Sequence, residues 1–330
     1  MGLFQYSFAG GGFLLIGAWE SYVAATEASR SPATGALPQP PEPGTKSAGL
    51  SSSSAVTFLA VSVLSFLFIV NSVISISEAI AAKDPTGLAL QLEVIAISLL
   101  FFLYSVLGFV TCTTRALQLP RQILNLISLF AFAEEFLLFY LQRKDPSGVE
   151  NRYYNLFLVP ISICAFSTIL ELKTPKSNYP RLGLGVGLIL QGIWFLQMGF
   201  SFFTGMIAHG CSLHKRSRGN YTIKCDGHPA YHRGGAIATL QFNCHLALLV
   251  VLVSGVYSVV CRMNGIEGEA SRYRPLGVGV QQLEMGGGSS HFTLDSDEDD
   301  EDDGGFIKKE EKNLEMQEMI QVTNGYHTHG

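Results

Sequence analysis

The stretch AVTFLAVSVLSFLFIVNSVISI at residues 55–76 decides the fold, because it contains no charged side chain over its whole length. About 20 consecutive apolar residues suffice to cross the hydrocarbon core of a bilayer as an α-helix. A second run of this kind, LALLVVLVSGVYSVV, occupies residues 246–260. Lipid offers no hydrogen-bond partners to the backbone, and the alternating short strands that a barrel needs are not seen in the sequence. The sequence therefore predicts an all-α membrane protein.

Five further segments resemble these two runs, which gives a predicted bundle of about seven transmembrane helices. The first of the seven lacks a preceding basic residue, so we interpret it as a retained span rather than a signal peptide. Gly183, Gly185 and Gly187 open the sixth, where small residues favour close contact between helices. The predicted spans are residues 3–24, 55–77, 88–111, 123–141, 154–172, 183–206 and 235–261.

Charge divides the chain into two parts. Hydrophobic residues make up 48% and charged residues 15% of the protein. Residues 1–261 hold 16 Lys and Arg against 12 Asp and Glu, whereas residues 262–330 hold 6 against 15. This predicts a membrane domain at 1–262, with a Pro/Ser-rich linker at 26–54 and a polar loop at 207–233, followed by a disordered acidic tail at 263–330. We expect the lipid bilayer as a partner and no nucleic acid.

The distribution of Lys and Arg in the loops predicts the orientation. If the 207–233 loop is set aside, the side shared with the N-terminus carries four of these residues and the opposite side ten. The favoured orientation has the N-terminus lumenal or extracellular and the C-terminus cytosolic. The four are Lys83, Arg143, Lys144 and Arg152, and the ten are Arg30, Lys46, Arg115, Arg121, Lys173, Lys176, Arg181, Arg262, Arg272 and Arg274.

The polar loop supports the same orientation and offers two chemical interpretations. Asn220-Tyr221-Thr222 is an N-glycosylation sequon, which predicts a glycan at Asn220 in a lumenal loop. Cys211 and Cys225 could form a disulfide around it, and this is the interpretation we favour. The alternative is a zinc site built from thiolates and imidazoles at short spacing. Apart from this zinc, no cofactor is predicted. The candidate zinc ligands are Cys211, His214, Cys225, His228 and His232, with His209 as a substitute.

Polar side chains within the predicted spans are the other candidates for chemistry. Ionisable groups inside a bilayer are costly and each needs a partner. We weigh two roles, a proton or ion relay and structural hydrogen bonding between helices, and favour the second. Adjacent residues on a helix point about 100° apart, so Glu134 and Glu135 must face different neighbours. The set consists of Glu134, Glu135, Gln191, Gln197 and His245.

The tail carries two short motifs. Tyr273-Arg274-Pro275-Leu276 fits the Tyr-x-x-apolar pattern of endocytic sorting signals, with Tyr273 and Leu276 as the residues that clathrin-adaptor machinery would read. Ser296 precedes a run of acids within DSDEDDEDD at 295–303, which suits an acid-directed kinase. Phosphorylation there would add charge to an already negative strand.

Several stretches resemble the family of animal transmembrane protein 45 and its plant relatives. They are GGGFLLIGAW at 10–19, EEFLLFY at 134–140, LQGIWFLQMGFSFF at 190–203 and QFNCHLALLVVLVSGVYSVVCR at 241–262. In the loop, GCSLH at 210–214, Cys225 and His232-Arg233 resemble the plant branch. The resemblance implies a multipass protein of the Golgi, endosomal system or plasma membrane, with an association to stress or infection. Tyr140, Gln142 and Tyr154 stand where family members commonly carry histidines, which weakens any expectation of metal or haem chemistry.

Three functions follow as hypotheses. The leading one is a membrane protein without a catalytic site that acts through partner or sorting interactions of its loop and tail. The second is a proton or ion transporter or channel that uses Glu134, Glu135 and His245. The third is a metal- or haem-dependent membrane enzyme. The dinucleotide, phosphate-binding and hydrolase motifs that would name another reaction do not occur in a suitable context.

Overall fold

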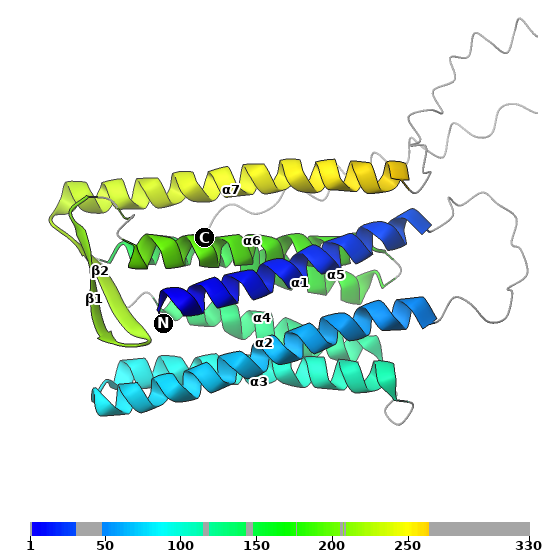
Figure 1. Ribbon diagram of the computed structural model, residues 1–330, viewed down its shortest axis with the longest axis horizontal. Helices are drawn as coiled ribbons and strands as arrows, with labels where there is room; N and C mark the ends of the chain where they lie inside the picture. Colours follow the sequence, from blue (N-terminus) through cyan, green and yellow to red (C-terminus); the bar gives the residue numbers. More distant parts are fainter. Residues whose placement is uncertain are drawn as a thin grey trace, which may run out of the picture. The chain divides into compact units, whose positions relative to one another are not determined.

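The structure, a computed structural model, describes residues 2–30, 48–114, 119–142, 148–175, 177–204, 207 and 209–263. All of these residues belong to one compact unit of the chain. The tail motifs with Tyr273, Leu276 and Ser296 lie outside the described residues. The described part forms helices and one hairpin (Figure 1): α1 (Leu3–Arg30), α2 (Ala48–Ala81), α3 (Pro85–Thr113), α4 (Arg121–Leu141), α5 (Glu150–Lys173), α6 (Tyr179–Phe203), β1 (Cys211–Ser217), β2 (Asn220–Cys225) and α7 (His228–Met263).

This architecture confirms the predicted all-α membrane fold. Within the described residues, six helices, α2 to α7, are long and apolar enough to cross a membrane, judged by length and composition. Helix α1, which covers the first of the seven predicted spans, is not among these six. The boundaries differ from the prediction around the Pro/Ser-rich segment. Because Ala24, Ala25, Glu27 and Ala28 favour helix, α1 continues to Arg30. Helix α2 begins at Ala48, so both ends of the predicted 26–54 linker are helical.

Helices α1 and α6 pack through glycines that recur at a spacing of seven on both helices. A Cβ atom at Gly10 would lie 2.7 Å from the carbonyl oxygen of Gly192, and one at Gly17 would lie 2.7 Å from that of Gly185. The pairs run in opposite directions along the chain, so the two helices are antiparallel. Seven residues bring the same helix face back after about two turns. The missing side chains therefore allow the two backbones to touch.

The neighbouring glycines of α6 face a different helix. A Cβ atom at Gly187 would lie 2.6 Å from the Sγ of Cys164, and one at Gly183 would lie 2.7 Å from the Oγ of Ser167. Both partners belong to α5. Helix α6 is thus held on two sides by small residues, in the close packing that the glycine pattern indicates.

The predicted 207–233 loop contains regular structure. Strands β1 and β2 pair antiparallel, with Cys211 opposite Cys225 and Ser217 opposite Asn220. Residues 218 and 219 form the turn, and α7 already begins at His228. The hairpin lies across the end of the bundle where α1 starts (Figure 1). The loop prediction therefore missed a hairpin, whose apolar Tyr221 and Ile223 are buried against the helices.

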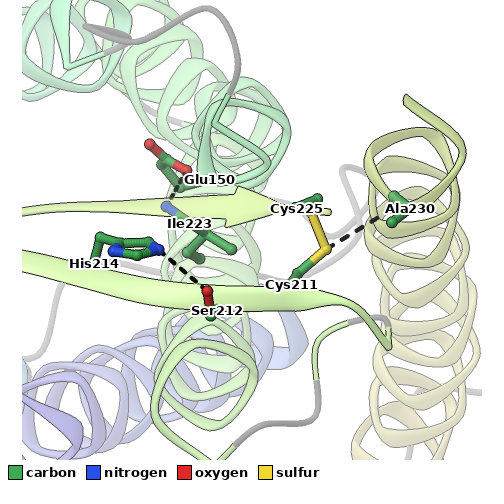
Figure 2. The surroundings of a disulfide bond; sticks show 7 residues. All are labelled: Glu150, Cys211, Ser212, His214, Ile223, Cys225 and Ala230. Atoms are coloured by element: carbon green, nitrogen blue, oxygen red, sulfur yellow. Dashed lines mark hydrogen bonds between the residues drawn. A yellow bond between two sulfur atoms is a disulfide. The ribbon is translucent and has the colours of Figure 1, made fainter. Parts of the chain in front are cut away.

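A cluster of tyrosines docks the hairpin on the bundle. The hydroxyl of Tyr221 is hydrogen-bonded to that of Tyr6 on α1. It also accepts a hydrogen bond of 3.1 Å from the hydroxyl of Tyr154 on α5. Burial raises the pKa of Tyr221 well above its usual value, so this hydroxyl stays protonated. The backbone N–H of Ile223 donates to the Glu150 carboxylate at 2.9 Å (Figure 2), which ties β2 to the start of α5.

Asp84 forms a second anchor, at the turn end of the hairpin. Its Oδ2 accepts hydrogen bonds of 2.8 Å from the Nδ2 of Asn220 and the Oγ of Ser217. Its Oδ1 accepts one of 3.2 Å from the N–H of Gly87, which caps the N-terminus of α3. One buried carboxylate therefore joins the α2–α3 connection to the hairpin.

Candidate functional site

Cys211 and Cys225 are joined in a disulfide at the open end of the hairpin. The Sγ of Cys211 lies 3.9 Å from the carbonyl oxygen of Ala230 in the first turn of α7 (Figure 2). The bridge therefore sits where the hairpin meets α7. Both thiolates of the zinc interpretation are used in this bond, and zinc needs deprotonated sulfur.

The histidines of the zinc interpretation lie on two separate elements. His214 is on β1, with its Nε2 3.2 Å from the Oγ of Ser212. His228 and His232 are one turn apart on α7, with their Nε2 atoms 3.2 Å apart. Among the described residues, no group of three or more His, Cys, Asp or Glu side chains is placed to hold a metal ion. The geometry of this loop is that of a docking element.

Asn220 is engaged by the bundle. Only 8% of the residue is exposed, and its Nδ2 donates to Asp84. A glycan would be attached through that same nitrogen. Glycosylation of Asn220 stays a prediction from the sequence, and in the docked hairpin the glycan would need room beside this buried contact.

The polar residues predicted within the spans do not form one relay in the described structure. Glu134 lies near Glu93 of α3, whereas Glu135 is buried beside Gln191 of α6. The side chain of Gln197 donates to the Oγ of Ser201 at 3.0 Å, one turn further along the same helix. His245 of α7 packs against the ring of Trp194, 6.3 Å away between centroids. Glu135 and Gln191 are thus the pair that the fold brings together.

Glu135 lines a cavity of about 360 Å³ whose wall is formed mainly by α1, α2, α3, α4 and α6, with Glu171 of α5 at one end. Most of its wall is aromatic and aliphatic. Such a mostly apolar pocket with a few polar groups is typical of small-molecule sites. The wall includes Phe13, Phe58, Leu64, Phe68, Val94, Ile97, Phe101, Phe132, Leu188 and Phe195.

The end of the cavity far from the hairpin is charged. Arg181 at the start of α6 donates from Nε to the carboxylate of Glu20 at 2.6 Å and from Nη1 to that of Glu27 at 2.9 Å. Arg121 and Glu171 also line this end. These groups lie near helix termini, where a membrane protein meets the polar headgroups. We call this end of the cavity the mouth.

The inner part of the cavity holds three polar side chains at about the same height along the helix axes, which we call their level. We call these residues, Ser65, Ser98 and Glu135, the polar belt. Phe101 of α3 and Phe132 of α4 pack at 5.1 Å between ring centroids, which fixes the register of these antiparallel helices. Ser98 lies three residues before Phe101 and Glu135 three residues after Phe132, so the two share a level. The pairing of Phe58 with Tyr104, at 5.3 Å, places Ser65 of α2 within about one residue of that level. All three side chains are buried and line the cavity.

Glu135 is incompletely satisfied within this belt. Its Oε2 is buried without a hydrogen-bond partner among the described residues, and so is the Oε1 of Gln191. Buried polar atoms are almost always paired, so an unpaired one at a cavity wall marks a place where a ligand or a water molecule would bind. Of the two atoms, the Oε2 of Glu135 belongs to a residue of the cavity wall. As a carboxylate oxygen it is an acceptor, so the group that would satisfy it from the cavity is a donor.

Sequence reasoning identified Glu135 and Gln191 but missed Arg181, Ser65 and Ser98 as parts of a site. A serine within an apolar run carries little signal, since it can bond to its own helix backbone. Arg181, Ser65 and Ser98 lie on different helices and reach the same cavity only because those helices pack together. The sequence alone does not give the register of that packing, so it could not group these residues.

The fold and the cavity define a multipass α-helical membrane protein with an internal apolar pocket. A family model described as Family of unknown function (DUF716) matches residues 121–258. The match extends from α4 to α7 and includes Glu135, Gln191 and the disulfide. A comparison with curated proteins finds no match.

Proposed function

We propose that this protein binds an amphipathic, lipid-like molecule in the cavity between α1, α2, α3, α4 and α6. The observation that carries the proposal is a largely apolar cavity, within a membrane fold, whose wall contains a buried and unsatisfied carboxylate. An apolar interior of this kind favours a hydrocarbon body, because burying apolar area is the main source of affinity. The polar belt would bind one specific group.

The dimensions suit a single extended chain. The lining residues of α4 run from Arg121 to Phe139, which corresponds to about 27 Å of helix. That length is close to the roughly 30 Å of hydrocarbon in a bilayer. A volume of about 360 Å³ is at the small end for ligand pockets, so it favours one chain over a two-chain lipid.

The proposal predicts that filling the cavity abolishes binding. Ser98→Trp places an indole in the middle of the cavity, at the level of Glu135. We expect the affinity for a single-chain lipid to fall by roughly tenfold or more, since the overlap must be relieved by displacing ligand or helices. Binding of a fluorescent single-chain lipid to the protein in nanodiscs measures this.

Ser258→Trp is the matched control, because Ser258 is exposed on α7 and does not line the cavity. It should bind the fluorescent lipid as the wild type does. Equal binding by Ser98→Trp and wild type, with both folded, would show that the lipid is held elsewhere and would end the proposal.

We also propose that the chain belongs to the transmembrane protein 45 family and that the hairpin faces the lumen or the exterior. The match of residues 121–258 to a family of unknown function is consistent with the motif resemblance. A disulfide persists in an oxidising compartment, which supports the orientation. A Golgi, endosomal or plasma-membrane location and sorting through the tail stay predictions from the sequence.

A single substitution tests this orientation. Lys215 is exposed on β1, and Lys215→Asn creates an Asn-Arg-Ser sequon with Arg216 and Ser217. If the hairpin is lumenal, the variant should gain mass that N-glycosidase treatment removes. Lys215→Gln provides the control without a sequon. A Lys215→Asn variant that never gains a glycan in a competent cell would contradict the orientation.

A further inference from the structure

We propose that the cavity selects a lipid that carries a protonated amine, and that the carboxylate of Glu135 binds this amine. The inference rests on the lipid-binding function proposed above and names the chemical class of the ligand. It is carried by the donor and acceptor inventory of the polar belt and by the positions of the charges around it.

The belt offers acceptors in the number that an ammonium group needs. An ammonium has three N–H donors and no acceptor. The unpaired Oε2 of Glu135 supplies one acceptor inside the cavity. The hydroxyls of Ser65 and Ser98, on two other helices at the same level, supply two more. Three acceptors from three helices can surround a single cationic group.

Charge favours an amine over other donors. Among the described lining residues, the cations are Arg121 and Arg181, and both lie at the mouth. Arg121 is 14 residues before Glu135 on α4, about 21 Å along the helix. Arg181 is already bound to Glu20 and Glu27. Among the described lining residues, no cation therefore lies at the level of Glu135.

A buried charge without a counter-ion is costly in a low-dielectric interior. A ligand amine would supply the counter-ion together with a charge-assisted hydrogen bond. A hydroxyl would supply one neutral hydrogen bond and leave the charge uncompensated. A fatty acid would bring a second negative charge to the same place. The expected order of affinity is therefore amine, then alcohol, then acid.

Glu134 provides an internal reference for this assignment. It is adjacent in sequence, half-buried, close enough to Glu93 to interact with its charge, and not part of the cavity wall. Removing its charge changes the total charge of the protein as much as removing that of Glu135. A general electrostatic effect on a cationic lipid would therefore respond equally to both residues, whereas a specific site would respond to Glu135.

The test compares dodecylamine, dodecanol and dodecanoate, which have equal chains and different polar groups. Binding is measured by competition with a fluorescent single-chain lipid, using the full chain in phosphatidylcholine nanodiscs. Glu135→Gln should weaken dodecylamine binding roughly 10- to 100-fold, as expected for loss of a hydrogen bond to a charged group. Binding of dodecanol should stay within about twofold, because glutamine preserves an acceptor. Glu134→Gln should bind all three probes as the wild type does.

The outcomes separate this inference from the function on which it rests. If dodecanol competes as well as dodecylamine in the wild type, or if Glu135→Gln leaves amine binding intact, the amine assignment is overturned while lipid binding stands. If the fluorescent lipid and all three probes fail to bind the wild type, the lipid-binding function fails as well. Equal losses in Glu134→Gln and Glu135→Gln would assign the effect to general electrostatics and overturn the site.

Discussion

Replacing Gly192 by alanine should destabilise the protein severely, although the change adds only one methyl group. The new Cβ would lie 2.6 Å from both the carbonyl oxygen of Gly10 and the backbone nitrogen of Leu14. Both are backbone atoms, so the contact cannot be relieved by rotating a side chain. We expect a loss of about 3 kcal/mol in the free energy of unfolding, at the upper end of overpacking effects. Thermal or denaturant unfolding in detergent measures this loss.

Gly11→Ala should have the opposite sign. Gly11 lies beside Gly10 in α1, but a Cβ there would meet nothing within 4 Å. The substitution should stabilise the helix by up to about 1 kcal/mol, since alanine favours helix over glycine. Similar effects of Gly192→Ala and Gly11→Ala would mean that helix propensity, rather than the contact between α1 and α6, determines stability.

The same contact bears on the cavity. Helix α6 contributes Arg181, Leu184, Leu188 and Phe195 to its wall, and α1 contributes Phe13 among others. If the two helices move apart, the lining residues that they contribute to the mouth and to the inner wall are displaced from one another. A variant at Gly192 that still folds should therefore bind the fluorescent lipid more weakly than Gly11→Ala does.

The sequence predicted the helices well because long apolar runs have few alternative structures in a bilayer. It also indicated the glycine contacts of α6, since small residues permit close approach wherever the partner lies. The hairpin was harder to predict. Its signal is short: Gly219-Asn220 at the turn and the alternation of Tyr221 and Ile223 with polar residues. The histidines and cysteines around it suggested metal chemistry instead.

The cavity could not be predicted from the sequence, because it depends on which residues of different helices share a level. Glu135 stood out as an intramembrane acid, and its separation from Glu134 followed from helix geometry. Its closeness to Ser98 depends on the register that Phe101 and Phe132 set. Arg181 appeared in the sequence as a loop charge, yet it is bound to two glutamates of α1.

The hairpin and the cavity are connected by aromatic packing. Phe139 and Phe195 line the inner end of the cavity, and their rings lie 6.1 Å apart between centroids. Phe139 also packs on Tyr154 at 5.9 Å, and Tyr154 donates to Tyr221 of the hairpin. The docked hairpin therefore supports the wall on which the cavity ends. Loosening the hairpin should therefore lower the affinity of the cavity for a bound lipid.

Asp84→Asn should undock the turn end of the hairpin. An asparagine keeps the shape but replaces one carboxylate oxygen by a donor. The new amide group then faces the donors of both Asn220 and Ser217 if it replaces Oδ2, or the N–H of Gly87 if it replaces Oδ1. In either case the charge-assisted hydrogen bonds of the carboxylate are lost. We expect a cost of about 3 kcal/mol, given what hydrogen bonds to buried charged groups contribute. Faster amide hydrogen exchange along β1 and β2 would report the undocking.

Acid should undo the same contact in the wild-type protein. Burial acts to raise the pKa of Asp84, but hydrogen bonds from Asn220, Gly87 and Ser217 and the charge of Arg216 together lower it below its ordinary value. A carboxyl whose folded pKa is depressed adds stability that is fully present above its unfolded pKa of about 4. That stability is lost as the pH falls through the folded pKa. The hairpin amides should therefore become less protected as the pH is lowered below about 4.

Asp226→Asn separates this effect from general acid damage. Asp226 lies just after β2 and is exposed at the other end of the hairpin. Its replacement should leave both hairpin protection and the acid response unchanged, whereas Asp84→Asn should lack the acid response because the titrating group is gone. An Asp84→Asn variant that loses protection below about pH 4 as steeply as the wild type would assign the transition to another carboxylate. Because Glu150 also binds the hairpin backbone, it would be the next residue to test.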